Sequence, residues 1–183
     1  MFKREPGRYV VLRVAFDLER AAHGRPVAYA ELAKALGIAL GETAPLADVR
    51  DAVLALRRGK GMVVDADDPC SVSAGSFFTN PILDVAAFEA LQHRAAPDGP
   101  PAWPEADGRV KTSAAWLIQR AGFKPGYGDG AVGISAKHSL ALINRGGGTT
   151  HELVALARHI AAGVQERFGV ALHPEPVFVG HTW

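Results

Sequence analysis

The chain has 183 residues and a formal net charge of +1; hydrophobic residues make up 48% of it and charged residues 21%. This composition indicates about one globular domain rather than a disordered chain. The balanced charge argues against nucleic acid or an acidic membrane as a partner held by overall attraction. The single cysteine, Cys70, excludes an internal disulfide and a cysteine-based zinc site. We find no apolar run of about 18 residues and no signal-peptide pattern, so a soluble cytoplasmic protein is predicted.

The first third of the sequence predicts one strand and two helices. Apolar residues on both faces of Tyr9–Phe16 predict a strand that is covered on both sides. Such a strand needs partners, either downstream in the chain or in a segment that precedes it. Residues 28–37 have a short helical period that ends in a glycine. Pro45 opens a second helix with one apolar stripe, which ends at Gly59 or Gly61.

The remaining sequence mixes helices with short strands. The expected elements are helices over 84–93, 112–122 and 149–168 and strands over 131–135, 139–144 and 175–180. Four prolines predict an irregular loop over 95–108. Thr149 and Glu152 have the spacing of a capping box at the start of the longest helix. Because no regular β-α-β alternation runs through the chain, an α+β fold is predicted.

Two features resemble ligand sites but also have ordinary interpretations. The glycines at 146–148 separate a strand from a helix, where backbone amides can cradle a phosphate. In the dinucleotide fingerprint the third glycine would fall at His151, so a plain tight turn is favoured. His138, beside Lys137 between two strands, is either a surface polar residue or a functional one. No histidine–glutamate spacing typical of a zinc site occurs, so no metal is expected.

The stretch AGSFFTNP at 74–81 combines a glycine, a serine, two phenylalanines and an Asn-Pro pair. The nucleophile motif GxSxG is absent, since Phe78 occupies the place of its second glycine. Ser76 can still donate a proton within a dry pocket, or it is simply a small residue at a tight crossing. Glu175 lies between two prolines, which makes it either a positioned acid or an exposed turn residue.

Several motifs together resemble one enzyme family. In order along the chain they are LRRGKG, AGSFFTNP, KTSAAWLIQRAG, VGIS with AKH and SLALIN, and RFGVALHPEPVFVG. They are similar to UDP-N-acetylenolpyruvoylglucosamine reductase, a flavoenzyme of peptidoglycan precursor synthesis, in its longer form. The resemblance covers essentially the whole chain, and GSFFxNP with SAAWLI is its most specific part.

The resemblance implies that NADPH reduces a bound FAD, which passes hydride to the enolpyruvyl double bond of UDP-N-acetylglucosamine enolpyruvyl ether. Ser76 matches the serine that protonates the resulting carbanion, and Glu175 the carboxylate that polarises the enolpyruvyl group. Lys60 and Asn80 match positions that bind the diphosphate of the substrate. His138 falls where the family places another side chain that contacts the substrate.

The resemblance also implies how the chain is organised. Residues 1–58 are expected to be the end of the FAD-binding domain, 59–172 the substrate-binding domain with a small mixed or antiparallel sheet packed against helices, and 173–183 a strand that carries Glu175. The region that binds most of the FAD has no counterpart here, so the isolated chain is expected to lack stable FAD binding and turnover. The missing FAD domain is a possible partner. The alternatives are a stand-alone UDP-sugar binding module and an inactive fragment.

Overall fold

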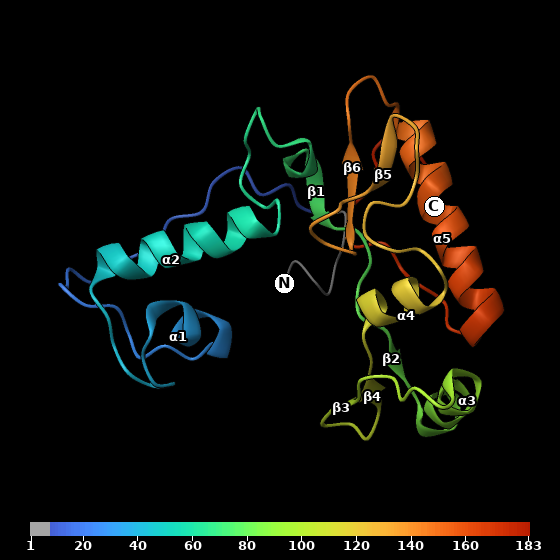
Figure 1. Cartoon of the computed structure of the whole chain (residues 1–183), viewed down its shortest axis with the longest axis horizontal. Coiled ribbons are helices and arrows are strands. Elements are labelled where there is room, and N and C mark those ends of the chain that lie inside the picture. Colours follow the sequence, from blue (N-terminus) through green and yellow to red (C-terminus); the bar gives the residue numbers. More distant parts are fainter. Residues whose placement is uncertain (1–7) are drawn as a thin grey trace. The chain divides into compact units, whose positions relative to one another are not determined.

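The computed structural model describes residues 8–183, which form two compact units, the second of which begins at Leu54. Helix α1 spans Ala30–Leu36 and ends where Gly37 adopts a left-handed φ of 67°. Helix α2 spans Leu46–Gly59, so the division between the units falls within it (Figure 1). Both helices confirm the sequence prediction.

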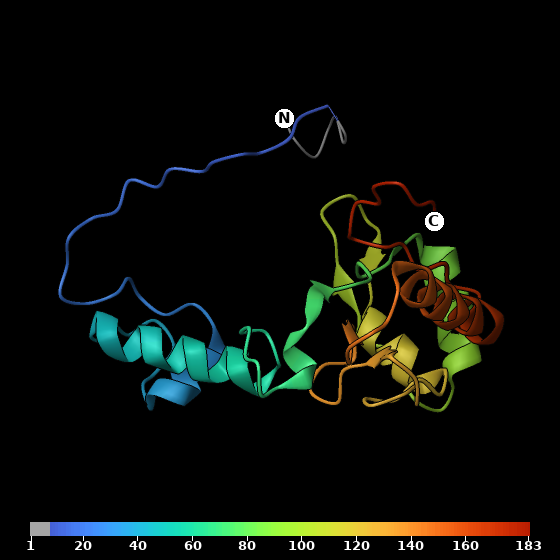
Figure 2. The ribbon, with the colours of Figure 1, turned by 90° about the horizontal axis from the view of Figure 1, so that it is seen from above.

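The predicted strand at Tyr9–Phe16 is wrong. Residues 8–20 contain no strand or bridge and follow a plain trace in Figure 2. Val10 and Leu12 on one face are 84% and 92% exposed and Val11 on the other is 52% exposed, so neither face of this segment is covered. A strand is stabilised by hydrogen bonds to a neighbouring strand, and apolar residues alone do not form one without that neighbour.

The second unit contains two three-stranded antiparallel sheets, with strand orders β1-β6-β5 and β2-β4-β3. Their strands are β1 Ser73–Ser76, β2 Ile82–Leu83, β3 Trp103–Pro104, β4 Val110–Lys111, β5 Val132–Ile134 and β6 Ala141–Asn144. β3 lies within the expected irregular loop. It pairs with β4 through a turn in which the backbone amide of Glu105 donates to the carbonyl oxygen of Arg109 at 2.9 Å. The α+β prediction is confirmed.

Three helices complete the second unit: α3 Val85–Ala95, α4 Ala114–Arg120 and α5 Thr150–Phe168, and a short 3-10 turn at Pro69–Ser71 precedes β1. α5 packs against α3, α4 and the strands β5 and β6, beside which it runs in Figure 1. The buried core lies among these elements and includes Phe78, Leu91, Leu117, Ile118, Ile134, Ile160 and Val164. The sheet that carries Ser76 is therefore supported from one side by a packed helical layer.

The predicted capping box at the start of α5 is present. Thr149 Oγ1 accepts a hydrogen bond from the Glu152 amide at 3.2 Å, and the Glu152 carboxylate accepts one from the Thr149 amide at 2.7 Å. The hydrogen bond from the Thr149 amide holds the pKa of Glu152 below its ordinary value. Gly169 ends the helix with a left-handed φ of 71°.

The predicted strand at 175–180 does not form. One isolated bridge, between Pro174 and Phe78, lies directly before the segment. Two backbone hydrogen bonds flank this bridge: the Thr79 amide donates to the His173 carbonyl at 3.0 Å and the Glu175 amide to the Phe77 carbonyl at 2.8 Å. Prolines on both sides of Glu175 lack N–H donors, which prevents a longer ladder.

Candidate functional site

A β-bulge in β1 determines on which face of the strand Ser76 lies. Ser73 lies opposite Ile143 of β6 and Ser76 lies opposite Ala141, so three steps along β1 match two along β6. Gly75 supplies the extra residue with a φ of 83°, a conformation that favours glycine. Its amide donates to Ser73 Oγ at 3.3 Å. Gly75 therefore sets the face of the strand on which Ser76 lies.

Ser76 and Glu175 line the same hollow, although 98 residues separate them in the sequence. The hollow has a volume of about 550 Å³, and its other lining residues are Met62, Ala74, Gly75 and Pro176. The hydrogen bond between the Glu175 amide and the Phe77 carbonyl fixes the backbone of Glu175 one residue away from Ser76. The structure thus brings together the two residues predicted to be catalytic.

The two phenylalanines after Ser76 anchor the segment in the core. Phe77 is 4% exposed and Phe78 is 2% exposed, and their ring centroids lie 5.1 Å apart in an edge-to-face arrangement. The Phe77 amide also donates to the Leu140 carbonyl at 2.7 Å. Because both rings are buried, Ser76 lies at the junction between the packed core and the open hollow.

Lys60 and His138 are close enough to interact electrostatically. Partial burial lowers the pKa of His138 below its ordinary value of 6.5, and the positive charge of Lys60 lowers that pKa further. His138 Nδ1 accepts a hydrogen bond from the Leu140 amide at 3.2 Å, which also favours the neutral ring. The structure therefore brings these two predicted substrate-binding residues near each other, but not into the lining of the hollow.

The pKa of His138 provides a direct test of this pair. Lys60→Met is expected to raise that pKa partway towards 6.5, because the positive charge is lost while burial remains. NMR titration of the His138 ring measures the shift, and Lys124→Met is the matched control that leaves it unchanged. Because the pKa of His138 is lower in the folded chain than in the unfolded chain, protonation of the ring favours unfolding. The stabilising contribution of neutral His138 is therefore complete above pH 6.5 and is lost as the pH falls below that value. An equal pKa in the wild type and in Lys60→Met would contradict the pairing.

Asn80 is oriented by the start of α4. Its Oδ1 accepts a hydrogen bond from the Ala114 amide at 3.0 Å, beside the Ser113 cap of the same helix. With the oxygen engaged, the side chain presents its amide group as a donor. That group suits an anionic oxygen, although Asn80 does not line the hollow that contains Ser76.

Several residues that shape this region were missed by sequence reasoning. Met62 lines the hollow, yet it belongs to none of the motifs. Lys137 Nζ lies 2.8 Å from Asp68, and this ion pair joins the loop before β1 to the turn between β5 and β6. The hydrogen bond between the two side chains lowers the pKa of Asp68 and raises the pKa of Lys137. Asp68 lies in an acidic cluster with Asp65 and Asp67, and this cluster was the available signal in the sequence for such a partner.

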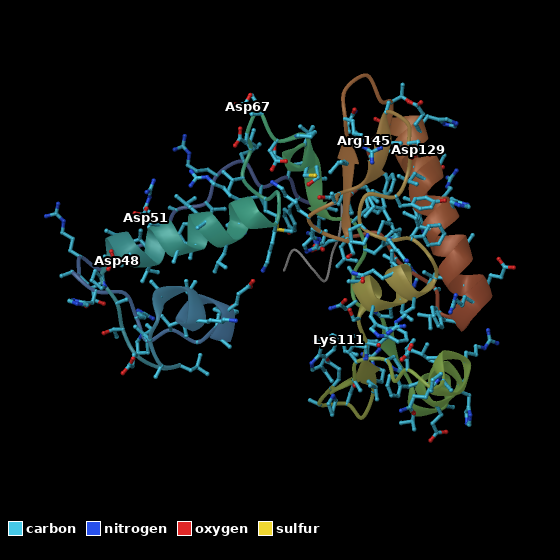
Figure 3. The ribbon with its side chains drawn as sticks, in the orientation of Figure 1. Asp48, Asp51, Asp67, Lys111, Asp129 and Arg145 are labelled. Atoms are coloured by element: carbon cyan, nitrogen blue, oxygen red, sulfur yellow. The ribbon has the colours of Figure 1, made fainter. Side chains whose placement is uncertain are left out.

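The glycine turn at 146–148 is used internally, as the plain-turn interpretation requires. The amides of Gly146 and Gly148 both donate to Asn144 Oδ1, at 2.9 and 3.1 Å. Figure 3 labels the neighbouring Arg145, whose guanidinium donates to the carbonyls of Gly128 and Gly130 at 2.6 and 2.9 Å. These hydrogen bonds close the loops at this end of the sheet.

Neither a metal-binding cluster nor a membrane-spanning helix is present among residues 8–183. No group of three or more histidine, cysteine, aspartate or glutamate side chains there is arranged to hold a metal ion. No helix in that range is long and apolar enough to cross a membrane.

The fold and the hollow define an α+β domain in which a hydroxyl-bearing and a carboxylate-bearing residue from distant segments line one hollow, a combination suited to proton transfer. Residues 67–179 match the family model described as UDP-N-acetylenolpyruvoylglucosamine reductase, C-terminal domain. The chain belongs to this reductase family.

Curated relatives with that reductase name match almost the whole chain. The relative from Thermobifida fusca is 60% identical over 96% of this chain and 51% of its own length. The relative from Salinispora arenicola is 58% identical over 98% of this chain and 50% of its own length. The relative from Cutibacterium acnes is 46% identical over 99% of this chain and 47% of its own length. The chain therefore spans about half the length of the curated relatives it matches.

Proposed function

We propose that the chain is the substrate-binding half of a reductase that converts UDP-N-acetylglucosamine enolpyruvyl ether to UDP-N-acetylmuramate in peptidoglycan precursor synthesis. The observation that carries the proposal is that Ser76 and Glu175 line one hollow, in a chain of this reductase family. The reaction needs a proton donor at the enolpyruvyl group, and a hydroxyl and a carboxylate on the same hollow supply suitable chemistry.

The two residues have distinct roles in this proposal. FAD, reduced by NADPH, supplies a hydride to the enolpyruvyl double bond when it is bound. Ser76 donates its hydroxyl proton to the adjacent carbon, where negative charge develops. Glu175 polarises the enolpyruvyl group, and its anchored backbone keeps the carboxylate on the same hollow. The proton and the hydride together saturate the double bond.

The residues present fit one side of a flavin ring but offer little for the rest of the cofactor. A Cβ built on Gly75 would meet no atom within 4 Å, so the surface beside Ser76 is open to a flat ring. Ala74 and Gly75 are the small residues that would face such a ring. The glycine turn most like a phosphate cradle has two of its amides engaged by Asn144. Stable FAD binding therefore calls for residues outside the described ones.

The diphosphate of the substrate is assigned to Lys60 and Asn80, and another contact with the substrate is assigned to His138. Lys60 provides a positive charge, and the oriented amide of Asn80 provides hydrogen-bond donors. A neutral His138 beside Lys60 keeps a second ring nitrogen available for the substrate. These assignments need no metal ion.

The proposal includes an organisation of the chain and a partner. Residues 1–58 belong to the end of an FAD-binding domain, 59–172 form the substrate-binding domain, and 173–183 carry Glu175. The remaining half found in the relatives supplies most of the FAD site, and the reaction takes place in the cytoplasm. The length of the relatives supports this arrangement, because the chain matches only about half of each.

The test compares two proteins. One is the chain alone, and the other is an intact reductase in which the chain is joined to the half that only its relatives contain. The intact protein is expected to bind FAD and to consume NADPH only when the enolpyruvyl ether is added. The chain alone is expected to be colourless and inactive. A flavin absorbance band in the purified chain would contradict the proposed division of the FAD site, and an intact protein without substrate-dependent NADPH oxidation would contradict the function. Substrate binding by the chain with no turnover in the intact protein would instead favour a UDP-sugar binding module.

A further inference from the structure

The last residue of the chain, Trp183, packs onto the segment that carries Ser76. Its ring centroid lies 6.3 Å from that of Phe77 and 6.0 Å from that of Phe78. Both phenylalanine rings are almost fully buried, whereas the indole is 41% exposed. The indole therefore forms an outer cover over the two rings that follow Ser76.

Trp183 also packs onto the segment that carries Glu175. Phe178 follows Glu175 by three residues, and its ring centroid lies 6.1 Å from that of Trp183 and 6.4 Å from that of Phe77. One aromatic cluster thus joins residues 77–78 to 178–183. Since edge-to-face and tilted ring pairs stabilise packing beyond the area they bury, the cluster strengthens a connection that otherwise rests on few backbone hydrogen bonds.

The backbone next to Trp183 is held by a residue of α5. Arg158 Nη2 donates a hydrogen bond to the carbonyl oxygen of Thr182, the residue before Trp183, at 2.9 Å. This contact limits the positions open to the terminal segment and lowers the entropy lost when the indole packs. The cluster is therefore attached to the helix that supports the core.

We propose that Trp183 is a positioning residue of the reductase site. Its ring clamps the segment after Ser76 to the segment after Glu175, so that hydroxyl and carboxylate keep one relative geometry. This inference rests on the proposed function of those two residues. Small displacements of catalytic groups reduce turnover strongly, so the expected effect is on kcat more than on KM.

Amide exchange on the 183-residue chain tests the clamp without any assumption about activity. Trp183→Ala is expected to speed exchange of the Thr79 and Glu175 amides about tenfold, because these two hydrogen bonds join the clamped segments. Amides within α5 should be unchanged, and Trp183→Phe should restore slow exchange. Trp103→Ala, at a tryptophan with 46% exposure on β3, is the matched control with no effect. Unchanged exchange at both amides, or equal acceleration throughout α5, would overturn the clamp.

Kinetics of the intact reductase then test positioning. Trp183→Ala is expected to lower kcat about tenfold with KM within about twofold, and Trp183→Phe to recover most of the loss. Faster amide exchange with an unchanged kcat would overturn the positioning role. Ser76→Ala is measured in the same preparation: if it keeps full kcat, the proposed function fails, whereas the exchange rates still decide whether Trp183 joins the segments.

Discussion

Replacing Ser76 by alanine in the intact reductase is expected to lower kcat about 10²–10⁴-fold, the contribution typical of a positioned proton donor. KM for the enolpyruvyl ether should change little, because the proposed role of the hydroxyl is in the transition state rather than in binding the substrate. The substitution removes one oxygen from a half-buried position beside an open hollow, so the fold should tolerate it. Steady-state kinetics with the enolpyruvyl ether measure both constants.

A hydroxyl on the same segment provides the control for Ser76. Thr79 is exposed, does not line the hollow, and donates from Oγ1 to the His173 carbonyl at 3.3 Å. Thr79→Val should therefore keep kcat within about twofold of the wild type. If Ser76→Ala raised KM by as much as it lowered kcat, Ser76 would be a substrate-binding residue and its assignment as the proton donor would be rejected.

Phe78→Ala is expected to have the largest effect on stability, about 3–5 kcal/mol of the free energy of unfolding. The ring is 2% exposed and lies within the core cluster, so its loss leaves a cavity that its neighbours cannot easily fill. Urea denaturation of the 183-residue chain measures the change.

A phenylalanine-to-alanine substitution at an exposed ring shows whether the loss of stability comes from burial or from the residue type alone. Phe16 is 78% exposed, so Phe16→Ala should change the free energy of unfolding by no more than about 0.5 kcal/mol. A comparable loss at both positions, or a change below about 1 kcal/mol at Phe78, would mean that Phe78 does not anchor the segment in the core.

The helices could be predicted because their signals are local. Gly37 and Gly169 end α1 and α5 in left-handed conformations, and the Thr149 capping box begins α5. Each of these signals depends on residues within a few positions of the helix end. Strands depend on a partner elsewhere in the chain, which is why apolar runs at Tyr9–Phe16 and 175–180 suggested strands that do not form.

In the candidate site, too, features encoded by local motifs could be predicted, whereas contacts between distant segments could not. The family resemblance named Ser76 and Glu175, and the structure places both on one hollow. The approach of Lys60 to His138 and the lining role of Met62 could not be predicted, because no local pattern encodes contacts between distant segments. Gly75 did carry a usable signal, since a glycine inside a strand often marks a bulge.

Because of the bulge at Gly75, the position of Ser76 depends on the number of residues between Ser73 and Ser76. Side chains alternate between the two faces of a strand, and the extra residue shifts that alternation by one step between Ser73 and Ser76. Deleting a single residue there would restore a regular ladder and turn the hydroxyl towards the opposite face. The length of this part of β1 is therefore as constrained as its residue types. A deletion here would disturb the orientation of Ser76 more than most substitutions would.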